Sequence, residues 1–95
     1  MSASFTVVTT AHYERLLRQL VRGNTEFLDS HVKAVGILSK DPYNRSRTHH
    51  IKKLTNVSVD DGEFRLRIGR YRFRYSIYDK EVVLYYCGLR REDTY

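Results

Sequence analysis

The sequence predicts an α+β fold in which a helical hairpin packs on one face of a small, mostly antiparallel sheet. Two patterns predict it: helical apolar spacing in the first half of the chain, and strand-like alternation in the second. A length of 95 residues fits one domain and not two, so residues 1–95 are expected to form a single domain. The expected element order is β-α-α-β-β-β.

The chain opens with a strand and a helix. Residues 4–9 are short, β-branched and apolar, which is typical of a strand. Thr9 or Thr10 can cap the helix that follows. Its apolar residues recur at the spacing of one buried helix face, at Tyr13, Leu16, Leu17, Leu20 and Val21.

A second helix follows the turn at residues 22–24, with Asn24 or Thr25 as its cap. Its expected apolar positions are Leu28, Val32, Val35 and Leu38. Proline cannot continue a helix, so Asp41-Pro42 ends it. Because the turn between them is short, the two helices should form a hairpin.

The second half of the chain begins with a mixed segment, residues 41–61, in which Ile51 and Leu54 either add a short strand or anchor a loop to the core. Three strands are expected next, over 63–68, 71–78 and 81–87, joined by tight turns. Cys87 lies in an apolar strand pattern, so we expect a buried, inert thiol. With both helices on one face, the opposite face of the sheet should be open.

Arginine alternates with apolar residues on the first two of these strands. Side chains alternate between the faces of a strand, so the apolar residues should face the helices and the arginines the open face. These arginines are Arg65, Arg67, Arg72 and Arg74. A solvated sheet face is one interpretation. However, like charges opposite each other destabilise a sheet, which favours selection for an anion such as a phosphodiester.

The overall charge agrees with an anionic partner. The chain carries 17 Lys and Arg against 11 Asp and Glu, and its formal net charge is +6. Nucleic acid, an acidic protein or an anionic membrane surface would fit this excess. No apolar run is long enough to span a membrane, and the N-terminus lacks the basic region of a signal peptide. We therefore expect a cytoplasmic protein.

The run GEFRLRIGRYRFRYSIYDKEVVLYYCGLRRE, with DPYNRSRTHHIKKL before it, resembles the RelE/ParE superfamily of bacterial toxins. The strand-helix-helix opening fits as well, so the resemblance covers almost the whole chain. It implies the toxin of a type II toxin–antitoxin system. RelE-like members are ribosome-dependent endoribonucleases that cut mRNA in the A site, whereas ParE-like members inhibit DNA gyrase.

The resemblance also implies a set of active-site residues, and their presence favours the nuclease over the gyrase inhibitor. The set comprises Arg65, Arg67, Arg72, Arg90 and Tyr95. The implied reaction is transesterification by the ribose 2′-OH, with no metal and no cofactor. Arg72 and Arg90 would stabilise the phosphorane with support from Arg65. Arg67 would position the backbone or protonate the leaving oxygen, and Tyr95 would stack on the nucleotide or help activate the 2′-OH.

The chain departs from the family at Arg65-x-Arg67, where the nucleases usually carry Lys-x-Lys. Arginine holds its proton, so a general base must come from elsewhere. The candidates are His49, His50, Glu63 and Tyr95. The two histidines could instead be surface loop residues, and Glu63 a cross-strand partner for an arginine. A third possibility is therefore a catalytically weak or antitoxin-like RNA-binding remnant.

Further basic and aromatic residues are candidates for RNA contact. The basic ones, whose alternative is plain surface, are Arg70, Arg74, Lys52, Lys53 and Arg91. Tyr78, Tyr85 and Tyr95 would offer surface on which bases can stack. The expected partners are a cognate antitoxin protein, the ribosome and its A-site mRNA. No membrane contact is expected, and DNA only indirectly through the antitoxin.

Overall fold

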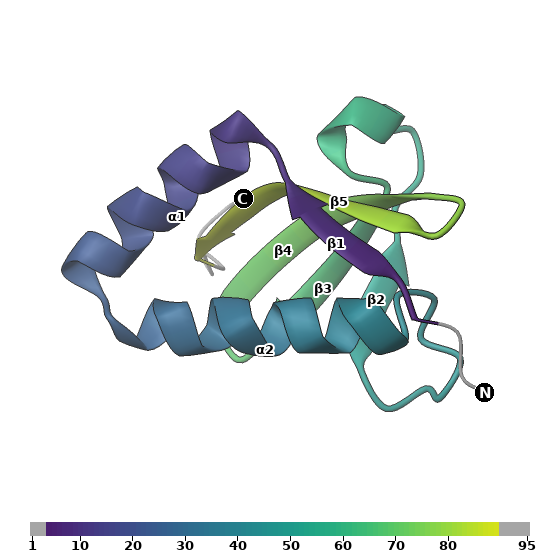
Figure 1. Cartoon of the computed structure of the whole chain (residues 1–95), viewed down its shortest axis with the longest axis horizontal. Coiled ribbons are helices and arrows are strands. Elements are labelled where there is room, and N and C mark those ends of the chain that lie inside the picture. Colours follow the sequence, from purple (N-terminus) through teal and green to yellow (C-terminus); the bar gives the residue numbers. More distant parts are fainter. Residues whose placement is uncertain (1–3, 90–95) are drawn as a thin grey trace.

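The computed structural model describes residues 4–89, which form one five-stranded sheet with two helices on one face (Figure 1). The elements are β1 (Thr6–Thr9), α1 (Ala11–Gly23), α2 (Glu26–Lys40), β2 (His50–Lys53), the short 3-10 helix η1 (Val59–Asp61), β3 (Phe64–Ile68), β4 (Tyr71–Tyr78) and β5 (Glu81–Leu89). The strand order is β1-β5-β4-β3-β2, and only the β1–β5 pair is parallel within this sheet.

The predicted α+β class and helical hairpin are confirmed. The observed order has one strand more than the expected one, because residues 50–53 pair with β3 as β2. Ile51 lies in this strand, opposite Leu66, whereas Leu54 follows it and donates its backbone N–H to the carbonyl oxygen of Glu63 (2.7 Å). The segment therefore both forms a strand and continues to hold the loop that follows.

The start of each helix is fixed by a polar side chain. Thr10 caps α1, since its hydroxyl oxygen accepts the backbone N–H of Tyr13 (3.0 Å). Asn24 does the equivalent for α2, where its amide oxygen accepts the backbone N–H of Glu26 (3.1 Å). Tyr13 is fully buried, and the rest of the predicted α1 stripe is packed against the core.

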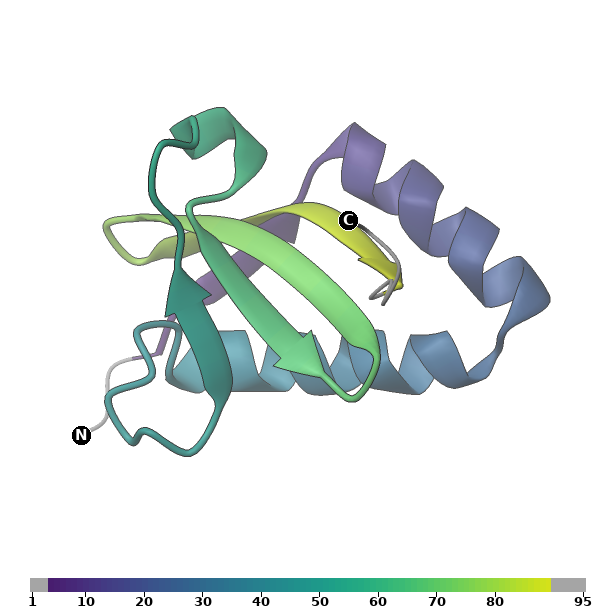
Figure 2. The ribbon, with the colours of Figure 1, turned by 180° about the vertical axis from the view of Figure 1, so that it is seen from behind.

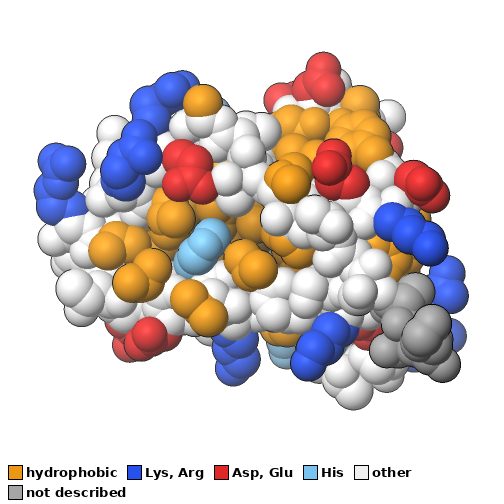
Figure 3. Space-filling view, in the orientation of Figure 1, with side chains coloured by type: hydrophobic (Ala, Val, Ile, Leu, Met, Phe, Trp, Pro, Cys, Tyr) orange, Lys and Arg blue, Asp and Glu red, His pale blue; other side chains and the backbone are white. Residues whose placement is uncertain are grey.

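The predicted inner face of α2 is wrong in its first half. Leu28 and Val32 are 46% and 63% exposed, and the fully buried residues are Phe27, Ala34 and Leu38. The cause is the Phe27 ring, which lies between β4 aromatic rings, 4.8 Å from Tyr71 and 5.6 Å from Phe73 between centroids. Consecutive helix residues point about 100° apart, so Leu28 turns toward solvent. Figure 3 shows hydrophobic side chains gathered on this outer surface of the helices.

Two tyrosines of β4 join the sheet to the helical hairpin. The Tyr75 hydroxyl is buried and donates to the carbonyl oxygen of Pro42 (2.6 Å), which follows α2. The Tyr71 hydroxyl donates to Glu26 Oε1 (3.0 Å) and accepts from the side-chain amide of Asn24, between the two helices. These bonds position the inner face of the sheet, so β3 and β4 present their other face away from the helices.

A β-bulge interrupts β5. Tyr75 pairs with Leu84, but the preceding residue, Arg74, pairs with Tyr86, so Tyr85 is the extra residue. Past the bulge the alternation is reversed. Cys87 is therefore buried as expected, at 1% exposure, and burial raises the pKa of its thiol to about 12. Tyr86 lies on the face opposite the helices.

The expected open face is in fact partly covered. Figure 2 shows this side of the sheet, with the segment that contains η1 lying over one end. Ser76 fixes it there, because its hydroxyl donates to the Val59 carbonyl oxygen (2.7 Å) and accepts the Glu63 N–H (3.0 Å). Gly62 passes over Arg74, whose guanidinium Nη2 donates to the Gly62 carbonyl oxygen (3.0 Å). The remaining part of this face is open.

Gly62 should be intolerant of any side chain. Its φ is +87°, and a Cβ there would lie 2.8 Å from Arg74 Cβ and 2.9 Å from the Tyr75 nitrogen. Gly62→Ala should lower the free energy of unfolding by at least about 2 kcal/mol, measured by urea titration. The matched control is Gly36→Ala in α2, where a Cβ meets nothing within 4 Å. This control should raise stability by about 0.5–1 kcal/mol. Equal effects of the two variants would contradict the assignment.

Candidate nucleic-acid interface

Two rows of side chains cross four strands on the open face. Each row is read from the strand pairing, because directly opposed residues point to the same face. The first, which we name the His50 row, consists of His50, Arg67, Arg72 and Gly88. The second, the Lys52 row, consists of Lys52, Arg65, Arg74 and Tyr86. The predicted placement of the four arginines on one face is therefore observed, and each row contains an arginine pair.

The two arginines of the His50 row lack a carboxylate partner within the described residues. Arg67 and Arg72 form no ion pair with residues 4–89, where the single ion pair joins His49 to Asp41. Arg72 Nε and Arg74 Nε are buried and meet no hydrogen-bond partner among the same residues. The guanidinium groups of Arg67 and Arg72 lie opposite each other and create a positive field, and such a surface favours an anion.

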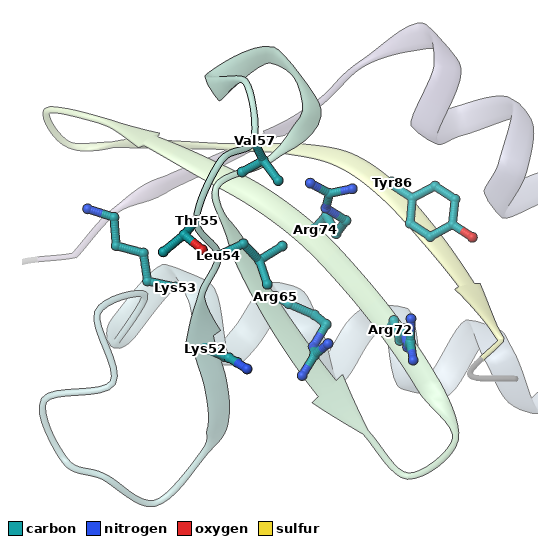
Figure 4. A pocket seen from close by; sticks show the side chains of 9 residues that line it. All are labelled: Lys52, Lys53, Leu54, Thr55, Val57, Arg65, Arg72, Arg74 and Tyr86. Carbon is teal, nitrogen blue, oxygen red and sulfur yellow. The ribbon is translucent and has the colours of Figure 1, made fainter. Parts of the chain in front are cut away.

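A hollow of about 480 Å³ lies over the Lys52 row (Figure 4). Its basic lining combines both rows with the end of β2, and its remaining walls are the start of the covering loop and one tyrosine. The lining residues are Lys52, Lys53, Leu54, Thr55, Val57, Arg65, Arg72, Arg74 and Tyr86. This volume is within the range of small-ligand pockets. We call it the main hollow.

A smaller hollow of about 270 Å³ adjoins it toward β2. It is lined by residues of β2, the residue before it and two arginines of β3, namely His49, His50, Ile51, Lys52, Arg65 and Arg67. Lys52 and Arg65 line both hollows, so the two lie next to each other at the Lys52 row. The two hollows together form a path along which an extended polyanion could lie.

The candidate general bases are differently placed. His50 is exposed beside Arg67 and lines the smaller hollow. His49 also lines it, but its Nε2 lies 3.9 Å from Asp41 Oδ2. Burial would raise the pKa of that carboxyl, but hydrogen bonds from Ser46 and from backbone N–H groups, with the His49 charge, lower it overall. Glu63 lines neither hollow.

The predicted RNA-contacting residues divide into two groups. Lys52, Lys53 and Arg74 line the main hollow, although Arg74 also holds the covering loop through Gly62. Arg70 lies in the β3–β4 turn, where its guanidinium carbon is 5.8 Å from the centroid of the Tyr71 ring. It lines neither hollow. Three further predicted residues, Arg90, Arg91 and Tyr95, lie outside the described residues.

Tyr86 lines the main hollow, although the sequence pattern did not predict it. The expected stacking residues Tyr78 and Tyr85 instead form a hydrogen bond between their hydroxyl groups (2.7 Å). Neither residue lines the main hollow. A signal for Tyr86 was available. Leu84 and Cys87 are both apolar strand residues, and both can face the core only if the strand carries an extra residue between them.

Within residues 4–89, no three His, Cys, Asp or Glu side chains are grouped so that they could hold a metal ion. Neither α1 nor α2 has the length and hydropathy of a helix that crosses a membrane.

The arginine pairs should cost stability. Arg67→Gln removes the repulsion between Arg67 and the opposing Arg72, so the free energy of unfolding should rise by up to about 1 kcal/mol at low salt. Salt screens this repulsion, so the gain should shrink in 1 M NaCl. Urea titration at both salt concentrations measures it. Arg18→Gln on the exposed face of α1 is the control and should change little; a loss of stability in Arg67→Gln would contradict the expectation.

Comparison with known proteins gives one informative match. No family model matches the chain, and no curated protein does. Among solved structures, the chain is similar to one from the crystal structure of the toxin–antitoxin complex RelBE2 from Mycobacterium tuberculosis. The TM-score is 0.69 and the sequence identity 28%, with 92% of this chain and 99% of that chain covered. The predicted resemblance to RelE-like toxins is thereby confirmed, since this chain shares the fold of a chain from the RelBE2 toxin–antitoxin complex.

Proposed function

We propose that this protein cleaves mRNA in the ribosomal A site as the toxin of a type II toxin–antitoxin system. The observation that carries the proposal is the opposition of Arg67 to Arg72 and of Arg65 to Arg74 beside a hollow. A phosphodiester is the group that such paired guanidinium groups bind best. The resemblance implies that the family's gyrase inhibitors lack much of a set that this sequence contains, and this supports the nuclease; the set is Arg65, Arg67, Arg72, Arg90 and Tyr95.

The proposed reaction is an attack of the ribose 2′-oxygen on the adjacent phosphorus. The bond from phosphorus to the 5′-oxygen breaks, the 2′-OH proton passes to a base, and the leaving oxygen takes up a proton. The products are a 2′,3′-cyclic phosphate and a 5′-OH end. Negative charge accumulates on the phosphorane between these steps, and donors fixed in advance on rigid strands stabilise it.

Arg72 is the first candidate for stabilising this charge. It lies on β4, between its row neighbours Arg67 and Gly88, and it lines the main hollow. Arg65 borders both hollows and is placed to support the same phosphate. The resemblance adds Arg90 to this group.

His50 is our candidate for the general base. Arginine does not release its proton near neutral pH, so the two rows cannot by themselves accept one from the 2′-OH. An imidazole both gains and loses a proton in that range. His50 stands opposite Arg67 in its row, so a phosphate held by the arginines would lie near this ring. Tyr95, from the resemblance, would then stack on the nucleotide.

The proposed partners follow from the similarity to a toxin–antitoxin complex and from the proposed cleavage of mRNA. The similar chain was solved in a toxin–antitoxin complex, which supports a cognate antitoxin protein as a partner of this chain. Contact with DNA would then run through the antitoxin. Ribosome and A-site mRNA are the partners that the proposed cleavage requires, and they place the protein in the cytoplasm.

Arg72→Ala should lower the cleavage rate by roughly 10²–10³-fold, because it removes charge stabilisation that is needed in the transition state. The measurement is primer extension on mRNA in a purified translation reaction, with cuts expected in phase with codons. Arg18→Ala, on α1, should cleave as the wild type does. Intact mRNA with the wild-type protein, together with inhibited DNA supercoiling by gyrase, would instead support the ParE-like alternative.

His50→Gln should lower the rate by about 10²–10⁴-fold at neutral pH if His50 is the base. His49→Gln is the matched control, because the His49 ring lies beside Asp41, and this variant should keep the wild-type rate. Wild-type cleavage by His50→Gln would assign the base to another group.

A further inference from the structure

We propose that the Tyr86 ring is a platform on which an unpaired RNA base stacks while the adjoining phosphates contact the arginine rows. The proposal rests on the proposed function in one respect, namely that the bound polyanion is RNA. It adds a specific subsite, formed by Tyr86 and Gly88 on β5, and it requires a single-stranded ligand.

The position of Tyr86 is the first argument. Tyr86 ends the Lys52 row directly opposite Arg74, and its ring borders the main hollow beside Arg72 and Arg74 (Figure 4). The side chain is 38% exposed. An aromatic surface is thus available at the same place where the guanidinium groups would hold a phosphate.

Gly88 is the second argument, because it fixes how the ring lies. A Cβ on Gly88 would be 2.9 Å from Tyr86 Cζ and 3.2 Å from Cε2. Gly88 belongs to the His50 row, and yet it is buried, because the Tyr86 ring lies over it. The ring therefore rests across the strand backbone on one side, and its other side is turned to the hollow. This orientation depends on the absence of a side chain at residue 88.

The Tyr86 ring and the nearby arginines together offer both kinds of contact that single-stranded RNA needs. A flat aromatic face beside cationic groups is the arrangement by which proteins bind single-stranded nucleic acid, with bases stacked and phosphates paired. In a duplex the base faces are already stacked inside the helix, so a duplex could use only the arginines.

The other exposed tyrosines among residues 4–89 do not offer this combination. Tyr78 is 39% exposed, close to the value for Tyr86. However, its hydroxyl is hydrogen-bonded to that of Tyr85, and Tyr78 lines neither hollow. Tyr43 is also exposed and lies with Phe5 and Phe64, 6.2 and 6.0 Å between ring centroids. Tyr78 is consequently a matched control for the removal of an exposed tyrosine.

The test compares two ligands of equal charge. One is a fluorescein-labelled, six-nucleotide single-stranded RNA with 2′-O-methyl riboses, which cannot be cleaved by 2′-oxygen attack. The other has the same backbone with every base removed. Fluorescence anisotropy with the purified protein should show that Tyr86→Leu weakens binding of the RNA about tenfold, whereas binding of the abasic oligomer stays within about twofold because it has no base to stack.

Three further variants sharpen the result. Tyr86→Phe keeps the ring and should bind both ligands as the wild type does. Gly88→Ala displaces the ring and should weaken RNA binding in the same direction as Tyr86→Leu. Tyr78→Leu should leave the binding of both ligands unchanged. Thermal unfolding of each variant shows whether the fold is retained.

Each outcome decides a different question. Equal weakening of both ligands by Tyr86→Leu, or no weakening of either, overturns the platform. Failure of the wild-type protein to distinguish the RNA from the abasic oligomer also overturns it. If binding depends on bases and on Tyr86 but mRNA stays intact, the platform stands and the nuclease proposal fails. If mRNA is cleaved and Tyr86→Leu binds RNA normally, the nuclease stands and the platform fails.

Discussion

The opposition of Arg67 to Arg72 is the interaction that the rest of the structure must accommodate. Two such pairs, each destabilising by about 0.2–1 kcal/mol, would by themselves push β3 and β4 apart. The opposite face of the same strands holds them together. Leu66, Phe73 and Tyr75 are at most 1% exposed there, and burial of each side chain contributes about 1.5–3 kcal/mol. The apolar residues therefore outweigh the repulsion several-fold, and the charges remain available to a ligand.

The two arginines of β4, Arg72 and Arg74, differ in their contacts, although they are two residues apart. Arg74 donates to the Gly62 carbonyl oxygen and so helps keep the covering loop in place. Arg72 has no such bond within residues 4–89 and faces the main hollow. The resemblance carries a catalytic role to Arg72 and none to Arg74, and this geometry offers a physical reason. A guanidinium engaged by the backbone is less free to follow a phosphate as its charge grows.

Local patterns predicted much of this structure, and contacts distant in sequence account for the rest. The two-residue period of β3 and β4 depends only on neighbours in sequence, so the arginine face was predictable. The choice of Phe27 over Leu28 depends on rings contributed by β4. Tyr86 faces the hollow because of a bulge whose register is set by pairing with β4. The loop over Ser76 likewise depends on bonds that cross the sheet. The cationic half of the site could therefore be read from sequence, while its aromatic half could not.

The strand order has a consequence for how the protein comes into being. β5 is the last described strand in the chain, and yet it lies inside the sheet, between β1 and β4. It carries Tyr86 and Gly88, and its partner β1 is the first described strand of the chain. The sheet cannot close until residues 81–89 have left the ribosome and inserted between two strands made earlier. Contacts this distant in sequence form late in folding. A nascent chain would therefore lack Tyr86 beside its arginine rows while it is still on the ribosome that synthesises it.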